Sequence, residues 1–294
     1  MYELIQISEN DYYIDCPAKI GLVKISDSEA VLIDSGSDKD AGKKVLRILD
    51  ENGWKLKAIF NTHSHADHIG GNRLIQERTG CPAYARGLEC AYTNFPQLEP
   101  AGLYGGNPFK DLKHKFLMAQ ESSAQLLTEE ALPEGMSIIE LPGHSFDMVG
   151  FKTKDGNAFI ADCVSSAATL EKYGIGYLWD VQASLETLEF IKTIDAKRFI
   201  PAHAPVYENI AELADLNIEA IKTAESRILD FCKEPAAFET LLKRVFDSYG
   251  LLMSAQQYVL IGSTLRSYLS ALHAQGLVSF EFINNEMLWK QEGK

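Results

Sequence analysis

The chain has 294 residues, 46% of them apolar, so it can bury a sizeable core and is long enough for one large domain plus a small appended one. Its net charge of -13 disfavours nucleic acid and anionic membrane as partners, unless a local basic patch overcomes that field. The five cysteines are odd in number and include no CxxC pair, which argues against a disulfide framework or a thiolate zinc site.

The N-terminal sequence gives an expectation of location. MYELIQISENDYY is acidic and lacks the basic start and long apolar stretch of a secretory signal. No apolar run approaches the roughly 18 residues that cross a bilayer. Together with the few cysteines, these features favour a reducing cytoplasm and no membrane partner.

Apolar runs and turn residues predict the elements of the first half. Residues 19–26 and 30–34 are short apolar strands around Ser26-Asp27-Ser28, which is typical of a β-hairpin. A helix is predicted over 38–51, stopped by Asn52-Gly53, and a buried strand over 57–62. A second helix is predicted over 67–79, with Gly80 as its stop.

Residues 86–133 interrupt this pattern with an irregular segment rich in Pro and Gly, in which only 113–121 is predicted to be helical. A segment this long usually forms a lid or a binding loop. Its aromatic residues either pack onto the core or line a pocket. They are Tyr92, Phe95, Tyr104 and Phe109.

Strands return in the second half, over 136–141, 148–153, 158–163 and 198–201, with a helix over 181–194. Strand runs in both halves with helices between them indicate two sheets covered by helices. From residue 216 the pattern changes to three helical segments and a terminal hairpin. We therefore expect a catalytic domain over 1–215 and a small, mainly helical domain over 216–294.

A cluster of histidines follows the strand that ends near Thr62. His63 and His65 stand at i and i+2 of an extended segment, so their imidazoles project to one side and suit one metal ion. Asp67 and His68 lie where the chain turns into a helix and suit a second ion. A polar surface loop is the alternative. The histidines at 144 and 203, each placed after a strand, favour the metal site.

The run Thr62 to Gly71, THSHADHIGG, resembles the signature of the metallo-β-lactamase superfamily, especially its glyoxalase II-like and lactonase-like branches. Four further segments of this chain resemble other motifs of that family, in the same order, along residues 10–210. They are Asp34-Ser35-Gly36, Leu141-Pro142-Gly143-His144, Asp162 and Pro201-Ala202-His203. The resemblance implies an α+β fold, the four-layer αββα sandwich, with metals at one edge between the loops of the two sheets.

The resemblance also implies a ligand set. It assigns His63, His65 and His144 to the first ion, Asp67, His68 and His203 to the second, and Asp162 to both as a bridge. Two cations roughly 3.5–4 Å apart lower the pKa of a bridging water and polarise the bond to be cleaved. Asp67 is also expected to act catalytically, by orienting the nucleophile or passing its proton. Mixed nitrogen and oxygen ligands favour two divalent ions, zinc first, with iron or manganese as alternatives.

This sequence departs from the family pattern at three places. Ala202 stands where the family commonly has Gly, and Ser-Phe-Asp follows His144 where relatives often carry Pro-Gly. Cys163 follows Asp162, and true lactamases place a cysteine ligand in this region. Because successive strand residues face opposite ways, only one of the two reaches the metals, and we favour Asp162.

Other polar and aromatic residues receive plainer interpretations. Asp34 is expected to brace the metal loop rather than bind metal. His114 is expected on the surface, and His273 in a C-terminal helix as a non-ligand. A set of aromatic residues after Asp162 packs on the core or forms the opposite wall of the site. It comprises Tyr173, Tyr177 and Trp179.

The C-terminal region resembles a winged helix, an appendage that some hydrolases of this superfamily carry, including a group that cleaves RNA. Residues 216–294 hold eight Lys and Arg against nine Asp and Glu, and the expected recognition helix over 254–276 carries only Arg266 as a fixed positive charge. Phosphate neutralisation supplies most non-specific affinity for nucleic acid, so packing or a homodimer is the expected role.

The leading hypothesis is therefore a metallohydrolase acting on a small-molecule ester, thioester or lactone. A single-stranded RNA endonuclease and an iron-dependent dioxygenase of a thiol derivative remain as alternatives. A non-catalytic metal-binding regulator would need a damaged site, and all the expected ligands are present. β-Lactam hydrolysis is disfavoured because secreted lactamases carry export signals, whereas we expect none in this sequence.

Overall fold

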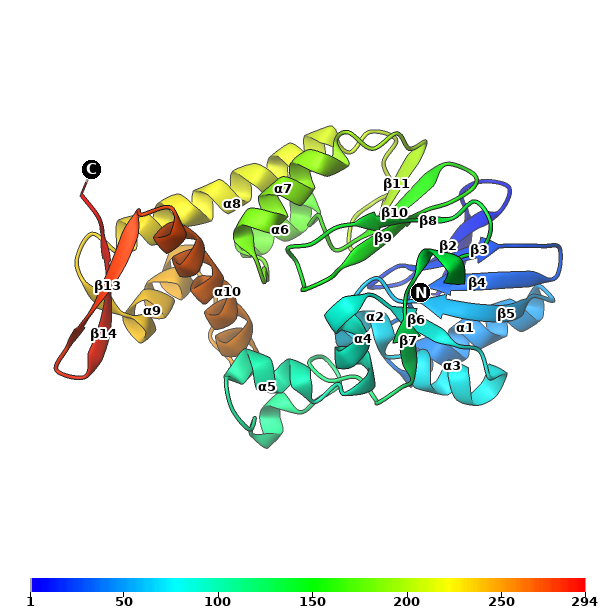
Figure 1. The fold of residues 1–294 in the computed structure, drawn as a ribbon, viewed down its shortest axis with the longest axis horizontal. Coiled ribbons are helices and arrows are strands. Elements are labelled where there is room, and N and C mark those ends of the chain that lie inside the picture. The colour runs from blue at the N-terminus through cyan, green and yellow to red at the C-terminus, as the bar shows by residue number, and fades with distance from the viewer. Residues whose placement is uncertain (1, 294) are drawn as a thin grey trace.

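The computed structural model describes residues 2–293. Two β-sheets face each other and helices cover both outer faces, so the chain forms the expected α+β sandwich of four layers (Figure 1). The strands of the first sheet follow one another in chain order across it. They are β1 (Glu3–Gln6), β2 (Asp11–Asp15), β3 (Ile20–Lys24), β4 (Glu29–Ile33), β5 (Lys55–Phe60), β6 (Ala83–Ala85) and β7 (Ala124–Leu126).

The expected first hairpin and helix are confirmed. β3 pairs antiparallel with β4, and α1 (Lys39–Glu51) returns the chain so that β5 lies parallel to β4. Asp38 caps α1, because its side chain accepts hydrogen bonds from the backbone N–H groups of residues 40 and 41. The apolar face of α1 packs on the outer face of this sheet through Val45, Ile48 and Leu49.

The second sheet holds the strands expected in the second half of the chain. In sheet order they are β11 (Arg198–Pro201), β10 (Asn157–Ala161), β9 (Val149–Lys152) and β8 (Ser137–Glu140). β10 and β11 are parallel because α6 (Ala167–Tyr173) and α7 (Val181–Ile191) lie between them in the chain. α6 was not expected.

Apolar side chains between the two sheets form the interior of the sandwich. Phe60 of the first sheet and Phe151 of the second have ring centroids 5.9 Å apart, and both rings are fully buried. Phe159 and Ile200 complete the same cluster. The core thus fixes the two sheets against each other and aligns the loops at their common edge.

The helix predicted over 67–79 is broken in two. α2 (Ala66–Ile69) ends at Gly70, and α3 (Asn72–Thr79) begins after Gly71. A Cβ atom on Gly71 would lie 2.3 Å from the Ser35 carbonyl oxygen, and one on Gly70 would lie 2.3 Å from the backbone of Ser37. The chain therefore bends where two segments pass too closely for any side chain.

The prediction of a helix over 113–121 is wrong. The helices of residues 86–133 are instead α4 (Gly87–Asn94), α5 (Leu98–Tyr104) and two 3-10 turns, over Lys110–Leu112 and Glu129–Ala131. Residues 113–121 run irregularly, with Leu117 and Ala119 buried. Ala119 packs on Ala66 and Ile69 of α2, so tertiary contact decides this segment rather than local propensity.

The C-terminal region has the three helices and the hairpin that the sequence indicates. The helices are α8 (Ala211–Phe231), α9 (Phe238–Tyr249) and α10 (Ala255–Ala274). The hairpin of β13 (Val278–Ile283) and β14 (Glu286–Gln291) is joined by the two-residue β12 (Ala236–Ala237). The expected boundary at 215 lies inside α8, and the division into two domains stays a prediction, as do a winged helix and a homodimer.

α10 runs back from the C-terminal region to contact α5 (Figure 1). No helix within residues 2–293 combines the length and apolarity that crossing a bilayer requires.

Candidate metal centre

Four segments of the chain at one edge of the sandwich bring the expected ligands together. His63 and His65 follow β5, and Asp67 and His68 belong to α2. The remaining three follow strands of the second sheet. His144 comes after β8, Asp162 after β10 and His203 after β11. Strands far apart in the sequence thus end at the same place, which positions all seven expected side chains.

The first ligand group consists of His63, His65 and His144, whose ligand atoms lie within 4.8 Å of one another. His144 Nε2 lies 3.0 Å from His65 Nδ1. Burial lowers the pKa of His65 and of His144 to about 4, and it lowers the pKa of His63 well below its usual value. All three imidazoles are therefore neutral near pH 7, which is the form that binds a cation.

The second ligand group consists of Asp67, His68 and His203, again within 4.8 Å. Asp67 Oδ2 lies 3.2 Å from His203 Nε2 and 3.7 Å from His68 Nε2. The charge of Asp162 raises the pKa of His203 to about 10. Burial opposes protonation of His68, but the surrounding carboxylates outweigh it and hold the pKa of this imidazole well above its usual value.

Asp162 lies between the two groups. Its Oδ1 is 3.3 Å from His68 Nε2, and its Oδ2 is 3.3 Å from His203 Nε2 and 3.5 Å from His144 Nε2. Ala161, the residue before it, has φ 48, and this turn ends β10. Among the described residues Cys163 belongs to none of the ligand groups and lines a cavity instead. The geometry agrees with the preference for Asp162 over Cys163.

These residues fit metal ions. His63 Nε2, His68 Nε2 and Asp162 Oδ1 are buried and have no hydrogen-bond partner within residues 2–293. Buried polar atoms without partners are costly, and here they all lie in the cluster of imidazoles and carboxylates. Such a mixed nitrogen and oxygen donor set suits divalent transition metals.

Asp34 braces the metal loop, as the sequence indicates. Its Oδ2 accepts hydrogen bonds from His68 Nδ1 at 2.8 Å and from Thr62 Oγ1 at 2.8 Å, and its Oδ1 accepts from Thr62 N at 2.8 Å. The bond to His68 fixes the ring so that Nε2 faces the site. Asp34 has φ 64, a left-handed conformation that Asp tolerates better than most residues.

Glu89, on α4, was missed by the sequence reasoning. It is fully buried, and its Oε2 accepts from the backbone N of Ser64 at 2.8 Å and from the hydroxyl of Ser64 at 2.5 Å. Its Oε1 accepts from Ser145 Oγ at 2.7 Å and from Asp147 N at 3.1 Å. One carboxylate therefore ties the His63–His65 loop to the His144 loop.

Glu99, on α5, was missed as well. Its Oε1 lies 3.6 Å from His65 Nε2, the ring nitrogen that does not face His144. Burial, with the charges of Glu89 and Asp67, raises the pKa of Glu99 to about 8. The available signal was a single acidic residue within each of two apolar runs, LECAY and LEPAGLY.

Tyr177 is the aromatic residue that reaches the site from the second half. Its ring centroid lies 5.4 Å from that of His65 and 5.7 Å from that of His144. Trp179 packs on Phe146 instead, with centroids 4.2 Å apart. His114 accepts a hydrogen bond from Phe116 N within the insert, residues 86–133. Among the described residues, neither His114 nor His273 belongs to a ligand group.

Comparison with known proteins agrees with this geometry. A family model described as the metallo-beta-lactamase superfamily matches residues 13–203, more than half of the chain. The chain belongs to the metallo-beta-lactamase superfamily. This match spans all seven expected ligands.

Two curated relatives and one solved structure illustrate the similarity. The hydroxyacylglutathione hydrolase of Methylococcus capsulatus is 29% identical over 164 residues, 55% of this chain and 51% of that protein. The chain thus spans about half the length of that relative. The probable metallo-hydrolase YflN of Bacillus subtilis is 28% identical over 229 residues, 74% of this chain and 80% of that one.

The solved structure is a metallo-beta-lactamase family protein from Thermus thermophilus. It has a TM-score of 0.72, covers 99% of this chain and 98% of its own, and is 14% identical. At this identity the likeness shows the fold alone, and it shows it for the C-terminal region as well as the sandwich.

Proposed function

We propose that this protein is a metallohydrolase that cleaves a small-molecule thioester, ester or lactone by means of two divalent cations. The observation that carries the proposal is the position of Asp162, whose carboxylate lies between the two ligand groups. Thioesters come first among these substrates because the relative from Methylococcus capsulatus is named a hydroxyacylglutathione hydrolase.

His63, His65 and His144 would hold one cation, Asp67, His68 and His203 the other, and Asp162 both. Cations there would make water acidic enough to supply a nucleophile near neutral pH and would polarise the scissile carbonyl. Zinc suits these ligands best, and iron or manganese are alternatives.

Asp67 has the exposure that a proton-transfer group needs. Its side chain is 42% exposed, whereas that of Asp162 is 10% exposed. Burial would raise the pKa of Asp67, but His68 and His203 hold it well below its usual value, so Asp67 is ionised at neutral pH. In the proposed reaction it orients water towards the carbonyl carbon and accepts its proton. The bond to sulfur or oxygen then breaks, and the leaving group takes up a proton, giving an acid and a thiol or alcohol.

Elemental analysis and a substrate screen test this proposal. We expect two metal equivalents per chain in the wild type, with hydrolysis of members of a thioester, ester and lactone panel. His65→Ala and His203→Ala should each lose metal and lower kcat/KM by at least about 1,000-fold, because each removes one ligand. His114→Ala, outside the ligand groups, should keep both properties. A single iron with O₂ consumption would replace hydrolysis by oxidation.

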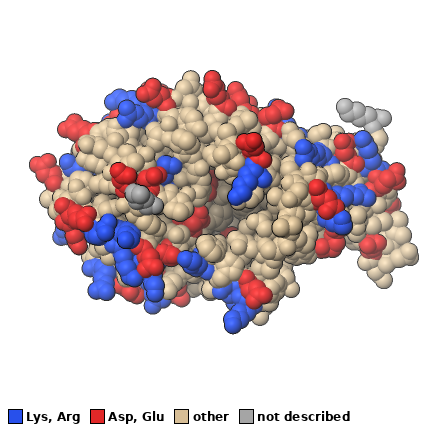
Figure 2. All heavy atoms as spheres, turned by 180° about the vertical axis from the view of Figure 1, so that it is seen from behind, with Lys and Arg blue, Asp and Glu red and all other residues tan. Residues whose placement is uncertain are grey.

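We also propose a small-molecule substrate rather than nucleic acid. Arg266, the one fixed positive charge of α10, stacks on the ring of Phe238 with its guanidinium carbon 3.8 Å from the centroid. On the face seen in Figure 2, Lys and Arg lie interspersed with Asp and Glu around the central hollow. Cleavage of single-stranded RNA that falls steeply with salt, without hydrolysis of the ester panel, would contradict the proposal.

A further inference from the structure

A cavity of about 150 Å³ extends behind the metal centre into the second half of the molecule. His144, Asp162 and His203 form its wall at one end. Ile221 of α8 and Tyr268 of α10 form the wall at the other, and Tyr268 is only 2% exposed. The space therefore leads from the proposed reaction centre towards the C-terminal helices.

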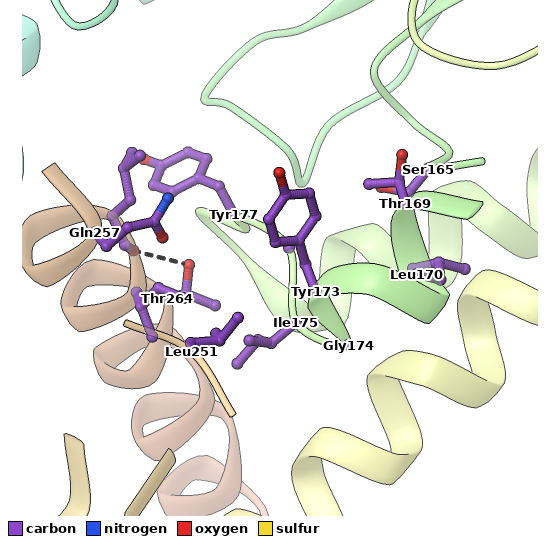
Figure 3. Close-up of a pocket in the computed structure, with 13 residues that line it drawn as sticks. Ser165, Thr169, Leu170, Tyr173, Gly174, Ile175, Tyr177, Leu251, Gln257 and Thr264 are labelled. Carbon is purple, nitrogen blue, oxygen red and sulfur yellow. Dashed lines mark hydrogen bonds between the residues drawn. The ribbon is translucent and has the colours of Figure 1, made fainter. Parts of the chain in front are cut away.

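A second cavity, of about 160 Å³, adjoins the first (Figure 3). Leu170, Ile175, Gly176 and Tyr177 are among the residues that line both, so the two spaces meet along α6 and the segment that follows it. In Figure 3, α10 borders this cavity on one side, with Gln257 and Thr264, and α6 borders it on the other.

The wall of the second cavity contains no Asp, Glu, Lys or Arg among the described residues. In the first cavity the only charged or ionisable groups of the wall, apart from Cys163 and Tyr side chains, are the metal ligands themselves. A charged or strongly hydrated group placed here would lose water without finding a partner, whereas an apolar chain would gain by leaving water.

The opposite side of the metal centre has a different character. A third cavity there has two carboxyl groups besides Asp162 in its wall, those of Asp67 and Glu99, together with apolar residues that include Phe116, which is 63% exposed. Tyr177 lines all three cavities and thus lies where they meet. A substrate held at the metals would have one arm beside these two carboxyl groups and one in the space whose wall has no charged group other than the expected metal ligands.

We propose that the two joined cavities bind the apolar acyl chain of the substrate, so that the enzyme selects acyl thioesters or esters by the length of that chain. This rests on the proposed hydrolytic function and names its substrate class. The polar leaving group departs on the Asp67 and Glu99 side. α10 belongs to the acyl site, because Leu260, Ile261 and Thr264 complete its wall.

A chain-length series tests the proposal. Thioesters of one thiol with acetyl, butyryl, hexanoyl and octanoyl groups are compared on the zinc-loaded full chain. We expect kcat/KM to rise about 4-fold per added methylene until the cavity is filled. Calorimetric titration with the corresponding free carboxylates gives a readout apart from turnover, and affinity should rise along the same series.

Two variants should shift the preference in opposite directions. A Cβ atom on Gly176 would meet only Ser165 Oγ, at 3.9 Å, so Gly176→Leu adds a side chain to the shared wall from a position with room for its Cβ atom. We expect it to lower the octanoyl-to-acetyl ratio of kcat/KM by about 10-fold. Leu170→Ala should widen the same wall and move the optimum to a longer chain. Ala168→Leu, on the exposed face of α6, should leave the preference unchanged.

The outcomes distinguish failure of the acyl site from failure of the proposed hydrolytic function. If thioesters are hydrolysed but the preference is flat, or neither Gly176→Leu nor Leu170→Ala shifts it, the acyl site is wrong and hydrolysis stands. If no ester, thioester or lactone is hydrolysed, the proposed function fails. The calorimetric titration with free carboxylates then tests by itself whether the cavities bind acyl chains. Affinity that does not rise with chain length, or that Gly176→Leu leaves intact, then overturns the acyl site.

Discussion

Each imidazole at the metal centre owes its charge state to the groups beside it. His65 and His144 face each other across 3.0 Å and are kept neutral by burial, whereas His203 faces two carboxylates and has a raised pKa. Spacing alone indicated a shared ion for His63 and His65, because i and i+2 histidines after a strand share a side. The resemblance to the metallo-β-lactamase superfamily supplied the rest of the seven expected ligands, and their binding of metal stays a prediction. Glu89 and Glu99 could not be predicted, since they lie in a segment whose path is decided by packing.

Glu99 is positioned to orient His65. A carboxylate beside the second ring nitrogen of a metal-binding histidine fixes the ring and makes it a better donor, and loss of such a group typically weakens metal binding 10–100-fold. Glu99 is a carboxylate above its raised pKa of about 8. We therefore expect Glu99→Gln to weaken zinc binding by about 10-fold at about pH 9, measured by competition with a chromophoric chelator.

The control for this prediction is Glu121→Gln, an exposed acid in the same insert. It should bind zinc as the wild type does. Equal affinity in Glu99→Gln and the wild type would show that Glu99 acts on something other than His65.

At the scale of elements, apolar runs and turn residues predicted β3 to β5 and β8 to β11, and the hairpin, α1 and β11 lie where the sequence indicates them. The strands β1, β2, β6 and β7 were not predicted, and neither was the order of strands within the sheets. Two elements differ because long-range contacts decide them. The helix predicted over 67–79 is broken at Gly70 and Gly71, because these residues closely approach the loop that follows β4. Residues 113–121 lie irregularly against α2. Neither contact leaves a periodic signal in the local sequence.

The break at Gly71 is required by that close approach. We expect Gly71→Ala to lower the free energy of unfolding by about 2 kcal/mol, because the Ser35 backbone must move to admit a methyl group. Zinc affinity should fall with it, since Ser35 Oγ also donates to the His68 carbonyl, at 3.1 Å. Chemical denaturation and zinc titration measure both effects.

Gly106→Ala is the matched control for Gly71→Ala. A Cβ atom at Gly106 would meet only the ring of Tyr104, at 3.9 Å. A Gly71→Ala protein as stable as the Gly106→Ala protein would contradict the steric account.

Asp11 links the two sheets and should make stability depend on pH. It lies on β2, and its Oδ2 accepts from Thr153 Oγ1 at 2.5 Å, directly after β9, and from Asn157 Nδ2 at 2.7 Å, at the start of β10. Burial raises the pKa of Asp11, so the folded protein keeps this proton to higher pH than the unfolded chain does. The folded state therefore loses stability as pH rises from the pKa of Asp11 in the unfolded chain to its higher pKa in the folded protein.

Urea unfolding of the wild type and of Asp11→Asn between about pH 4 and pH 7 measures this loss. We expect the unfolding free energy of the wild type to fall relative to that of Asp11→Asn as pH rises, because the amide cannot ionise. Parallel curves for the two proteins would mean that Asp11 has the same pKa folded and unfolded.

For the whole molecule, the C-terminal helices are packed into the enzyme rather than merely attached to it. One hydrophobic cluster runs from Ile160 and Phe199 of the second sheet through α7 and α8 to Leu265 of α10. A smaller cluster joins Val259 of α10 to Leu103 of α5 in the insert. A change in composition near residue 215 indicated a second unit, but it carried no information on how much core the two units share.

This shared core leads us to expect one cooperative unfolding transition. Leu265 is fully buried, and Leu265→Ala should lower the free energy of unfolding by about 3 kcal/mol, as should Leu22→Ala in the first sheet. Far-UV circular dichroism, tryptophan fluorescence and residual zinc binding should give coincident midpoints in urea for both variants. If Leu265→Ala instead produced an early transition that left zinc binding intact, residues 216–294 would fold as an independent domain. α10 could then leave the acyl cavity without disturbing the metal centre.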